Sequence, residues 1–96
     1  MKYFHRTQLA PSTILVRATE FFGARLGPLE ESARRRRFAG TIGQIAVTAV
    51  PEGGHYTLVT VETNQVGESE ADRLAKRFLT LVHGVAEPTH RPIGAY

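Results

Sequence analysis

Residues 45–63, IAVTAVPEGGHYTLVTVET, decide the fold. Ile45, Val47 and Ala49 alternate with their neighbours, and this period of two predicts a β-strand. Residues 51–54, Pro-Glu-Gly-Gly, are a strong turn signal, because glycine adopts positive φ without strain. The segment 56–63 is rich in β-branched residues, which pack well on a pleated sheet. Together these residues predict an antiparallel hairpin.

A helix is predicted after the hairpin. Ser69 is a good N-cap, and Asp72 completes a capping box three residues later. Apolar residues then recur at helical spacing, so one stripe of this helix is expected to face a core. The stripe consists of Ala71, Leu74, Ala75, Phe78, Leu81 and Val82. His83 and Gly84 predict its end, because glycine favours the cap that terminates a helix.

The N-terminal part of the chain predicts a strand followed by a second helix. Residues 2–9 alternate weakly between two sets of side chains, which indicates a strand near a sheet edge. Ser12 predicts the cap of a helix whose apolar residues recur at helical spacing. Gly27 and Pro28 predict the end of that helix, because proline cannot continue it.

The middle of the chain is expected to return to extended structure. Residues 29–33 predict a connecting turn, and the pattern is extended again from Arg34. Gly40 and Gly43 indicate a bulge or tight turn between two strands. The predicted order is therefore β-α-β-β-β-α. This order predicts an α+β fold, a two-layer sandwich in which two helices cover a short antiparallel sheet.

The chain length predicts a single domain. Its 96 residues leave no room for a second independent core. We expect the domain to cover residues 1–84. Residues 85–96 contain two prolines and no periodicity, so they predict a flexible C-terminal tail.

The composition restricts the location and the chemistry. The chain has no cysteine, which excludes disulfides, thiolate catalysis and the common structural zinc sites. The first residues, Met1 to Arg6, show no apolar leader, and no stretch approaches the length of a membrane span. We therefore expect a cytoplasmic protein without a membrane span.

The sequence gives little support to catalysis. The four histidines, His5, His55, His83 and His90, have no metal-ligand spacing, and no serine lies in a nucleophile elbow. Glu62 lies in an apolar strand, where burial would raise its pKa, but its spacing favours a side chain that faces solvent. No catalytic residue, metal or cofactor is predicted, and a non-enzymatic role is favoured.

A run of four arginines, Arg34, Arg35, Arg36 and Arg37, is the sharpest feature. In a strand they alternate, so two face each side of the sheet. One interpretation is a contact with phosphate or an acidic partner. The favoured alternative is an edge strand that charge protects from aggregation. Most of the net charge of +3 comes from this run, because residues 51–96 hold six acidic residues against four basic ones.

Part of the second half resembles the helix-grip superfamily (START or Bet v 1-like, polyketide-cyclase-like). The resemblance lies in Gly40-Thr41-Ile42, the turn 50–54, the Thr57-Leu58-Val59 strand and the helix with Arg77-Phe78-Leu79. It implies that the last helix covers a curved sheet and that the space between them holds an apolar ligand. The residues expected to line this space are Phe22, Leu74, Phe78 and Leu81.

The element order also resembles one repeat of the TATA-binding-protein-like fold, with Ser69 to Ala75 similar to the start of its last helix. In that fold, two halves join edge to edge into a saddle. About four strands are too few to enclose a cavity, so both resemblances imply a homodimer with a continuous sheet.

The sequence therefore predicts a non-enzymatic binding domain. We expect a homodimer that holds a small apolar ligand or a protein partner between helix and sheet. One alternative is a nucleic-acid-binding dimer that uses Arg34 to Arg37. Another is a small assembly or scaffold subunit whose tail, residues 87–96, docks on another protein.

Overall fold

The computed structural model describes residues 1–86. It has the predicted α+β class: two helices lie against an antiparallel sheet of five strands in the order β1-β5-β4-β3-β2. The elements in chain order are β1 (Lys2–Thr7), α1 (Pro11–Gly23), β2 (Gly27–Glu31), β3 (Arg35–Gly40), β4 (Gly43–Glu52), β5 (Tyr56–Thr63) and α2 (Glu70–Ala86).

The predicted hairpin forms the centre of the sheet. Strands β4 and β5 pair antiparallel from Ile45 opposite Thr63 to Glu52 opposite Tyr56. Gly53 and Gly54 both have positive φ in the turn, which explains the need for glycine there. The first strand, β1, pairs with β5 and lies at one edge, as its weak alternation predicts.

The strand β2 differs from the turn predicted for residues 29–33. It forms the other edge of the sheet, pairs with β3, and its register shifts between Pro28 and Glu30. Local sequence does not favour a strand here, since Pro28 lacks a backbone N–H. An edge strand tolerates proline, because one side of it needs no partner. Pairing with β3 therefore stabilises a strand that the local pattern does not reveal.

The helix ends also differ in detail from the prediction. Helix α1 starts at Pro11, after the N-cap residue Ala10, so Ser12 lies inside the helix and is not its cap. Proline suits the first helical position because the N–H there needs no partner. Helix α2 continues through Gly84 to Ala86. The predicted tail therefore begins inside this helix, and its residues 87–96 lie outside the described residues.

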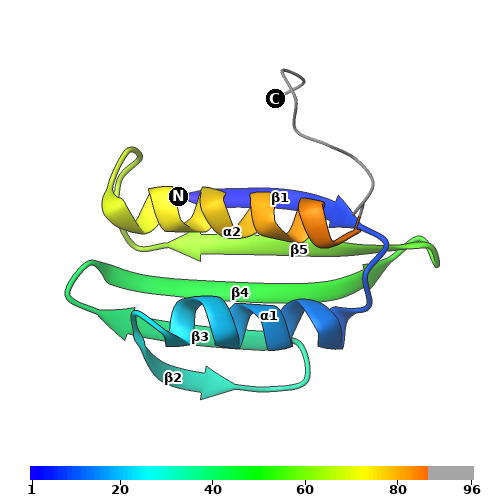
Figure 1. Cartoon of the computed structure of the whole chain (residues 1–96), viewed down its shortest axis with the longest axis horizontal. Coiled ribbons are helices and arrows are strands. Elements are labelled where there is room, and N and C mark those ends of the chain that lie inside the picture. Colours follow the sequence, from blue (N-terminus) through cyan, green and yellow to red (C-terminus); the bar gives the residue numbers. More distant parts are fainter. Residues whose placement is uncertain (87–96) are drawn as a thin grey trace.

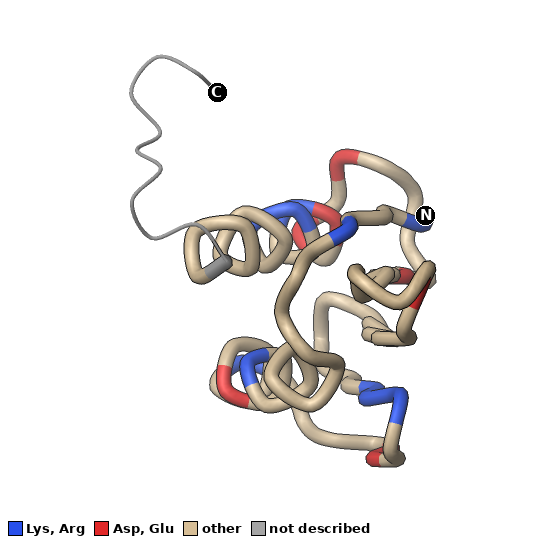
Figure 2. Tube along the Cα trace, turned by 90° about the vertical axis from the view of Figure 1, so that its right-hand side faces the viewer, with Lys and Arg blue, Asp and Glu red and all other residues tan. Residues whose placement is uncertain are grey.

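Both helices cover the same face of the sheet. Helix α1 packs over β3 and β4, whereas α2 packs over β1 and β5 and runs in the opposite direction (Figure 1). The core between the layers contains the buried side chains of Phe22, Phe38 and Phe78. The ring centre of Phe22 lies 5.5 Å from that of Phe38 and 5.1 Å from that of Phe78. Viewed from the side, no helix of residues 1–86 lies on the second face of the sheet (Figure 2).

Candidate binding face

The side chains that point away from the helices define the helix-free face. In β4, Ile45, Val47 and Ala49 are buried beneath the helices, so the alternate residues point outward. Residues directly opposite one another on paired strands point to the same face, so the register identifies the outward-facing residues of the neighbouring strands. The helix-free face consists of Lys2, Phe4, Arg6, Arg35, Arg37, Gln44, Ala46, Thr48, Val50, Leu58, Thr60 and Glu62.

The middle of the helix-free face has no charge. Ala46, Thr48 and Val50 of β4 lie beside Leu58 and Thr60 of β5, and all five are half-buried. Next to them, on β1, the side chain of Phe4 is 60% exposed. When one face of an antiparallel sheet is exposed to solvent, the side chains on that face are normally polar. This uncharged centre is therefore a surface suited to contact with another macromolecule.

Charged residues surround this centre. Arg6 forms an ion pair with Glu52 at one end. At the other end, a guanidinium nitrogen of Arg37 lies 3.3 Å from a carboxylate oxygen of Glu30. Here a hollow of about 250 Å³ lies over Ala46, and its lining includes Arg35, Gln44, Glu62 and Asn64. The exposed Glu62 points outward, as its spacing predicts.

The expectation that the arginine run forms an edge strand is wrong, because β3 lies between β4 and β2 and Arg34 precedes β3. Within β3 the arginines alternate between the two faces, as predicted. Arg35 and Arg37 lie on the helix-free face, whereas Arg36 lies on the helix side, opposite the buried Val47. The guanidinium of Arg36 donates to the backbone oxygens of Ser32 and Arg35. Among residues 1–86, no acidic side chain forms an ion pair with Arg34 or Arg35.

The four predicted ligand-lining residues lie in two different environments. Phe22, Leu74 and Phe78 are buried together in the core, where their neighbours include Phe38. Leu81 lies on α2 and is 40% exposed. The structure thus brings three of the four together and places Leu81 outside the core. Core packing accounts for the positions of the three buried side chains.

Asp72 is a buried charged residue whose surroundings have little local signal in the sequence. Its side chain is 0% exposed and accepts hydrogen bonds from three hydroxyls. The donors are the hydroxyls of Tyr3 at 2.8 Å, Thr63 at 3.0 Å and Ser69 at 2.5 Å. These bonds join β1, β5 and the start of α2. The sequence reveals only the capping box, because Tyr3 and Thr63 are distant along the chain.

The hydrogen bonds set the ionisation of this group. Burial alone would raise the pKa of the Asp72 carboxyl, but hydrogen bonds from Ser69, Tyr3 and Thr63 outweigh burial, so its pKa lies below the ordinary value. Burial, followed by the hydrogen bond to Asp72, raises the pKa of the Tyr3 hydroxyl. Because all its close partners are protein hydroxyls, the carboxylate stabilises the fold and is not placed to act on a substrate.

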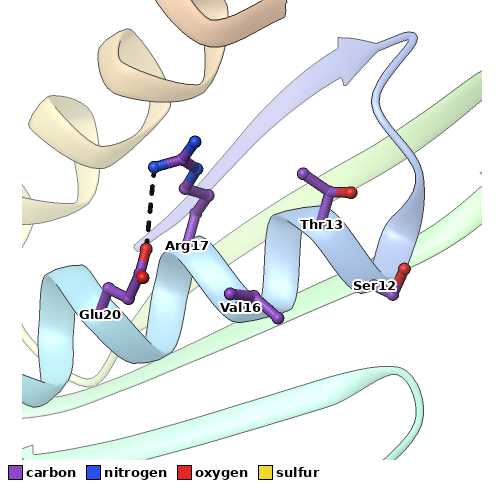
Figure 3. A pocket seen from close by; sticks show the side chains of 5 residues that line it. All are labelled: Ser12, Thr13, Val16, Arg17 and Glu20. Atoms are coloured by element: carbon purple, nitrogen blue, oxygen red, sulfur yellow. Dashed lines mark ion pairs between the residues drawn. The ribbon is translucent and has the colours of Figure 1, made fainter.

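A second hollow, of about 360 Å³, lies on the outer side of α1 (Figure 3). It is lined by Ser12, Thr13, Val16, Arg17 and Glu20. Arg17 and Glu20 form an ion pair with each other at 3.8 Å. All five residues belong to one helix, so no second element supplies converging groups. The helix-free face is the better candidate because three strands supply its uncharged centre.

The two edges of the sheet differ in how they are protected. Strand β2 carries Pro28 and a register shift, and both features oppose pairing with a further strand. Strand β1 contains no proline and pairs regularly with β5 over six residues. Its outer edge is therefore the better one for an additional strand.

Comparisons with protein families, curated proteins and solved structures find no match. In the part of the chain that the structure describes, no helix is long and apolar enough to span a membrane. Within residues 1–86, no three His, Asp or Glu side chains gather as a metal site would require. The resemblances to the helix-grip and TATA-binding-protein-like folds stay predictions.

Proposed function

We propose that this chain is a non-enzymatic binding domain that works as a homodimer and binds a protein partner on its helix-free face. The observation that carries this proposal is the uncharged centre of that face, which neither helix covers. Burial of half-exposed apolar side chains favours association with another protein. The absence of cysteine suits a reducing environment, and we place this function in the cytoplasm.

The dimensions of the sheet support a homodimer. Five strands about 4.8 Å apart and about 20 Å long give a face of roughly 500 Å². A stable complex buries about 800 Å² on each partner. Two sheets joined edge to edge would provide roughly 1,000 Å², which meets this requirement. The resemblance to a fold in which two halves join at their edges also supports the dimer.

An apolar ligand between helix and sheet is less well supported. Such a ligand would have to separate Phe22 from Phe78, whose ring centres lie 5.1 Å apart in the core. Both side chains are fully buried, so a ligand here would replace existing apolar contacts. The geometry therefore favours the helix-free face over the space between the layers.

Nucleic-acid binding is a second candidate, because Arg34 and Arg35 have no acidic partner among the described residues. Binding to single-stranded DNA should then weaken steeply as salt rises from about 50 to 200 mM. Arg35→Ser should reduce this binding, whereas Arg73→Ser on the exposed side of α2 should not. Binding that is independent of salt and of Arg35 would contradict this candidate.

Native mass spectrometry of the full chain at micromolar concentration tests the leading proposal. We expect a dimer, together with any bound protein that copurifies. A monomer at this concentration contradicts the homodimer, and a copurified lipid or metabolite would favour ligand binding between helix and sheet. The proposed role of the tail in a scaffold concerns residues 87–96, outside the described residues.

A further inference from the structure

The hydrogen bonds of β1 show which of its backbone groups face the free edge. The N–H of Thr63 donates to the carbonyl oxygen of Met1 at 2.8 Å, and the amino group of Met1 donates to that of Thr63 at 3.0 Å. In an antiparallel pair such exchanges occur at every second residue. Tyr3, His5 and Thr7 therefore bond β5, whereas the backbone groups of Lys2, Phe4 and Arg6 point away from the sheet.

The same three residues carry side chains on the helix-free face. Phe4 lies at their centre, and 60% of its side chain is exposed. Arg6 already pairs with Glu52 of its own chain, and Lys2 lies opposite Glu62 in the register. The edge thus presents the apolar Phe4 between two cations, Lys2 and Arg6, each with an acidic residue of the same chain on the neighbouring part of the sheet. Such a pattern suits pairing with an uncharged or self-complementary strand.

We propose that β1 pairs antiparallel with β1 of a second copy, about a two-fold axis at Phe4. This inference rests on the proposed homodimer and names its interface. In this register Phe4 exchanges two backbone hydrogen bonds with the partner's Phe4, and their rings lie side by side on the helix-free face. Lys2 faces the partner's Arg6, and vice versa.

The geometry of this pairing extends the candidate binding face. A two-fold axis perpendicular to the sheet keeps the helices of both copies on the same side. The two helix-free faces then form one continuous surface. Facing cations oppose the pairing, but Arg6 forms an ion pair with Glu52 of its own chain, and Lys2 lies opposite Glu62 in the register. Registers shifted by two residues would place Phe4 opposite Lys2 or Arg6 of the partner and lose the contact between the two rings.

The second copy is preferred to an extended peptide of another protein because the middle of this edge strand can face its own copy. Two-fold symmetry requires a residue that can face itself, and the uncharged Phe4 meets this requirement at the middle of the strand. In the opposite edge strand the uncharged middle residue, Leu29, lies between Pro28, which lacks a backbone N–H, and Glu30, and the register is irregular there, so regular two-fold pairing is disfavoured. Pairing through β1 covers an edge that no strand of residues 1–86 pairs with, and it leaves the protected β2 edges outside.

The mass of the full chain in solution, measured by light scattering after gel filtration, tests this interface. Phe4→Lys removes the ring contact and adds facing charges, so we expect the dimer dissociation constant to rise about tenfold or more. Leu29→Lys is the matched control, because Leu29 is 53% exposed on the other edge strand. It should leave the dimer unchanged. Circular dichroism checks that both variants remain folded.

A cross-linking measurement gives an independent answer if Phe4→Lys fails to fold. The chain has no cysteine, so Phe4→Cys introduces a single thiol. Facing residues in a hydrogen-bonded pair lie about 5.5 Å apart at Cα, within the range that a disulfide spans. Mild oxidation should link most chains of Phe4→Cys into covalent dimers, whereas Leu29→Cys should remain largely monomeric under denaturing conditions.

The outcomes separate this inference from the proposed function. A monomeric wild type overturns both the homodimer and the β1 interface. A dimeric wild type whose Phe4→Lys variant stays equally dimeric overturns the β1 interface alone. The same holds if Leu29→Lys, and not Phe4→Lys, dissociates the dimer, or if Leu29→Cys cross-links more readily than Phe4→Cys. Dissociation and cross-linking confined to the Phe4 variants support the interface.

Discussion

Asp72 is the residue whose replacement should affect stability most clearly. Its buried carboxylate accepts three hydroxyl donors, and asparagine offers one acceptor oxygen and an amide that must itself be paired. We expect Asp72→Asn to lower the free energy of unfolding by about 2–3 kcal/mol. Glu70→Gln is the control, because Glu70 is exposed in the same helical turn, and its cost should be about 0.5 kcal/mol. Denaturant unfolding of both variants measures the difference, and equal losses would contradict the role of Asp72.

Asp72 also predicts how stability depends on pH. Its pKa in the folded protein is lowered relative to the unfolded chain, where an Asp titrates near about 3.9. The stabilisation is therefore complete above that unfolded pKa and is lost as pH falls through the folded pKa. The stability gap between the wild type and Asp72→Asn should shrink below about pH 4. Denaturant midpoints measured from neutral to acidic pH test this, and a constant gap would exclude it.

The sequence predicts part of this residue-scale picture. Ser69 and Asp72 lie three residues apart at the start of α2, so their capping interaction is visible as a local sequence pattern. Tyr3 and Thr63 reach Asp72 only because β1 pairs with β5 next to the start of α2. A contact between residues 69 positions apart, such as Tyr3 and Asp72, depends on the tertiary fold and has no local signal.

At the scale of elements, two glycines should respond oppositely to the same substitution. Gly43 starts β4 with φ of 125°, and a Cβ there would lie 2.7 Å from the side chains of both Asn64 and Gln65. Gly43→Ala should therefore lower the free energy of unfolding by about 1–3 kcal/mol. Gly84 lies within α2, and a Cβ there would meet open space. Gly84→Ala should therefore raise the free energy of unfolding by about 0.5–1 kcal/mol. Thermal unfolding measures both, and a shared sign would contradict this assignment.

Elements with strong local signals could be predicted, and those stabilised by pairing could not. The β4–β5 hairpin and α2 have turn, capping and periodicity signals within their own segments. Strand β2 has none, because Pro28 and the following glutamates resemble a loop, and its pairing with β3 makes it a strand. The alternation of Arg35, Arg36 and Arg37 could be predicted, since it follows from strand geometry alone.

At the scale of the whole molecule, the candidate binding face depends on arrangement. Periodicity indicates that each helix buries one stripe, but not that both stripes cover the same side of the sheet (Figure 2). Likewise, the weak alternation of residues 2–9 predicts an edge strand, whereas its exposed backbone groups follow from its register with β5. Both properties arise from contacts between distant segments, so the face and its open edge become visible only in the folded chain.

The proposed homodimer predicts that stability depends on protein concentration. Unfolding of a dimer releases two chains, so mass action favours the folded state as concentration rises. For a domain of this size, the melting temperature should increase by about 3 °C for each tenfold rise in concentration. Phe4→Lys should lower the melting temperature at each concentration and weaken this dependence where the variant is monomeric, if β1 forms the interface, while Leu29→Lys should behave as the wild type. Scanning calorimetry over a hundredfold range of concentration measures the effect. A melting temperature of the wild type that is independent of concentration would show that dissociation does not accompany unfolding, and would contradict a dimer whose subunits separate as they unfold.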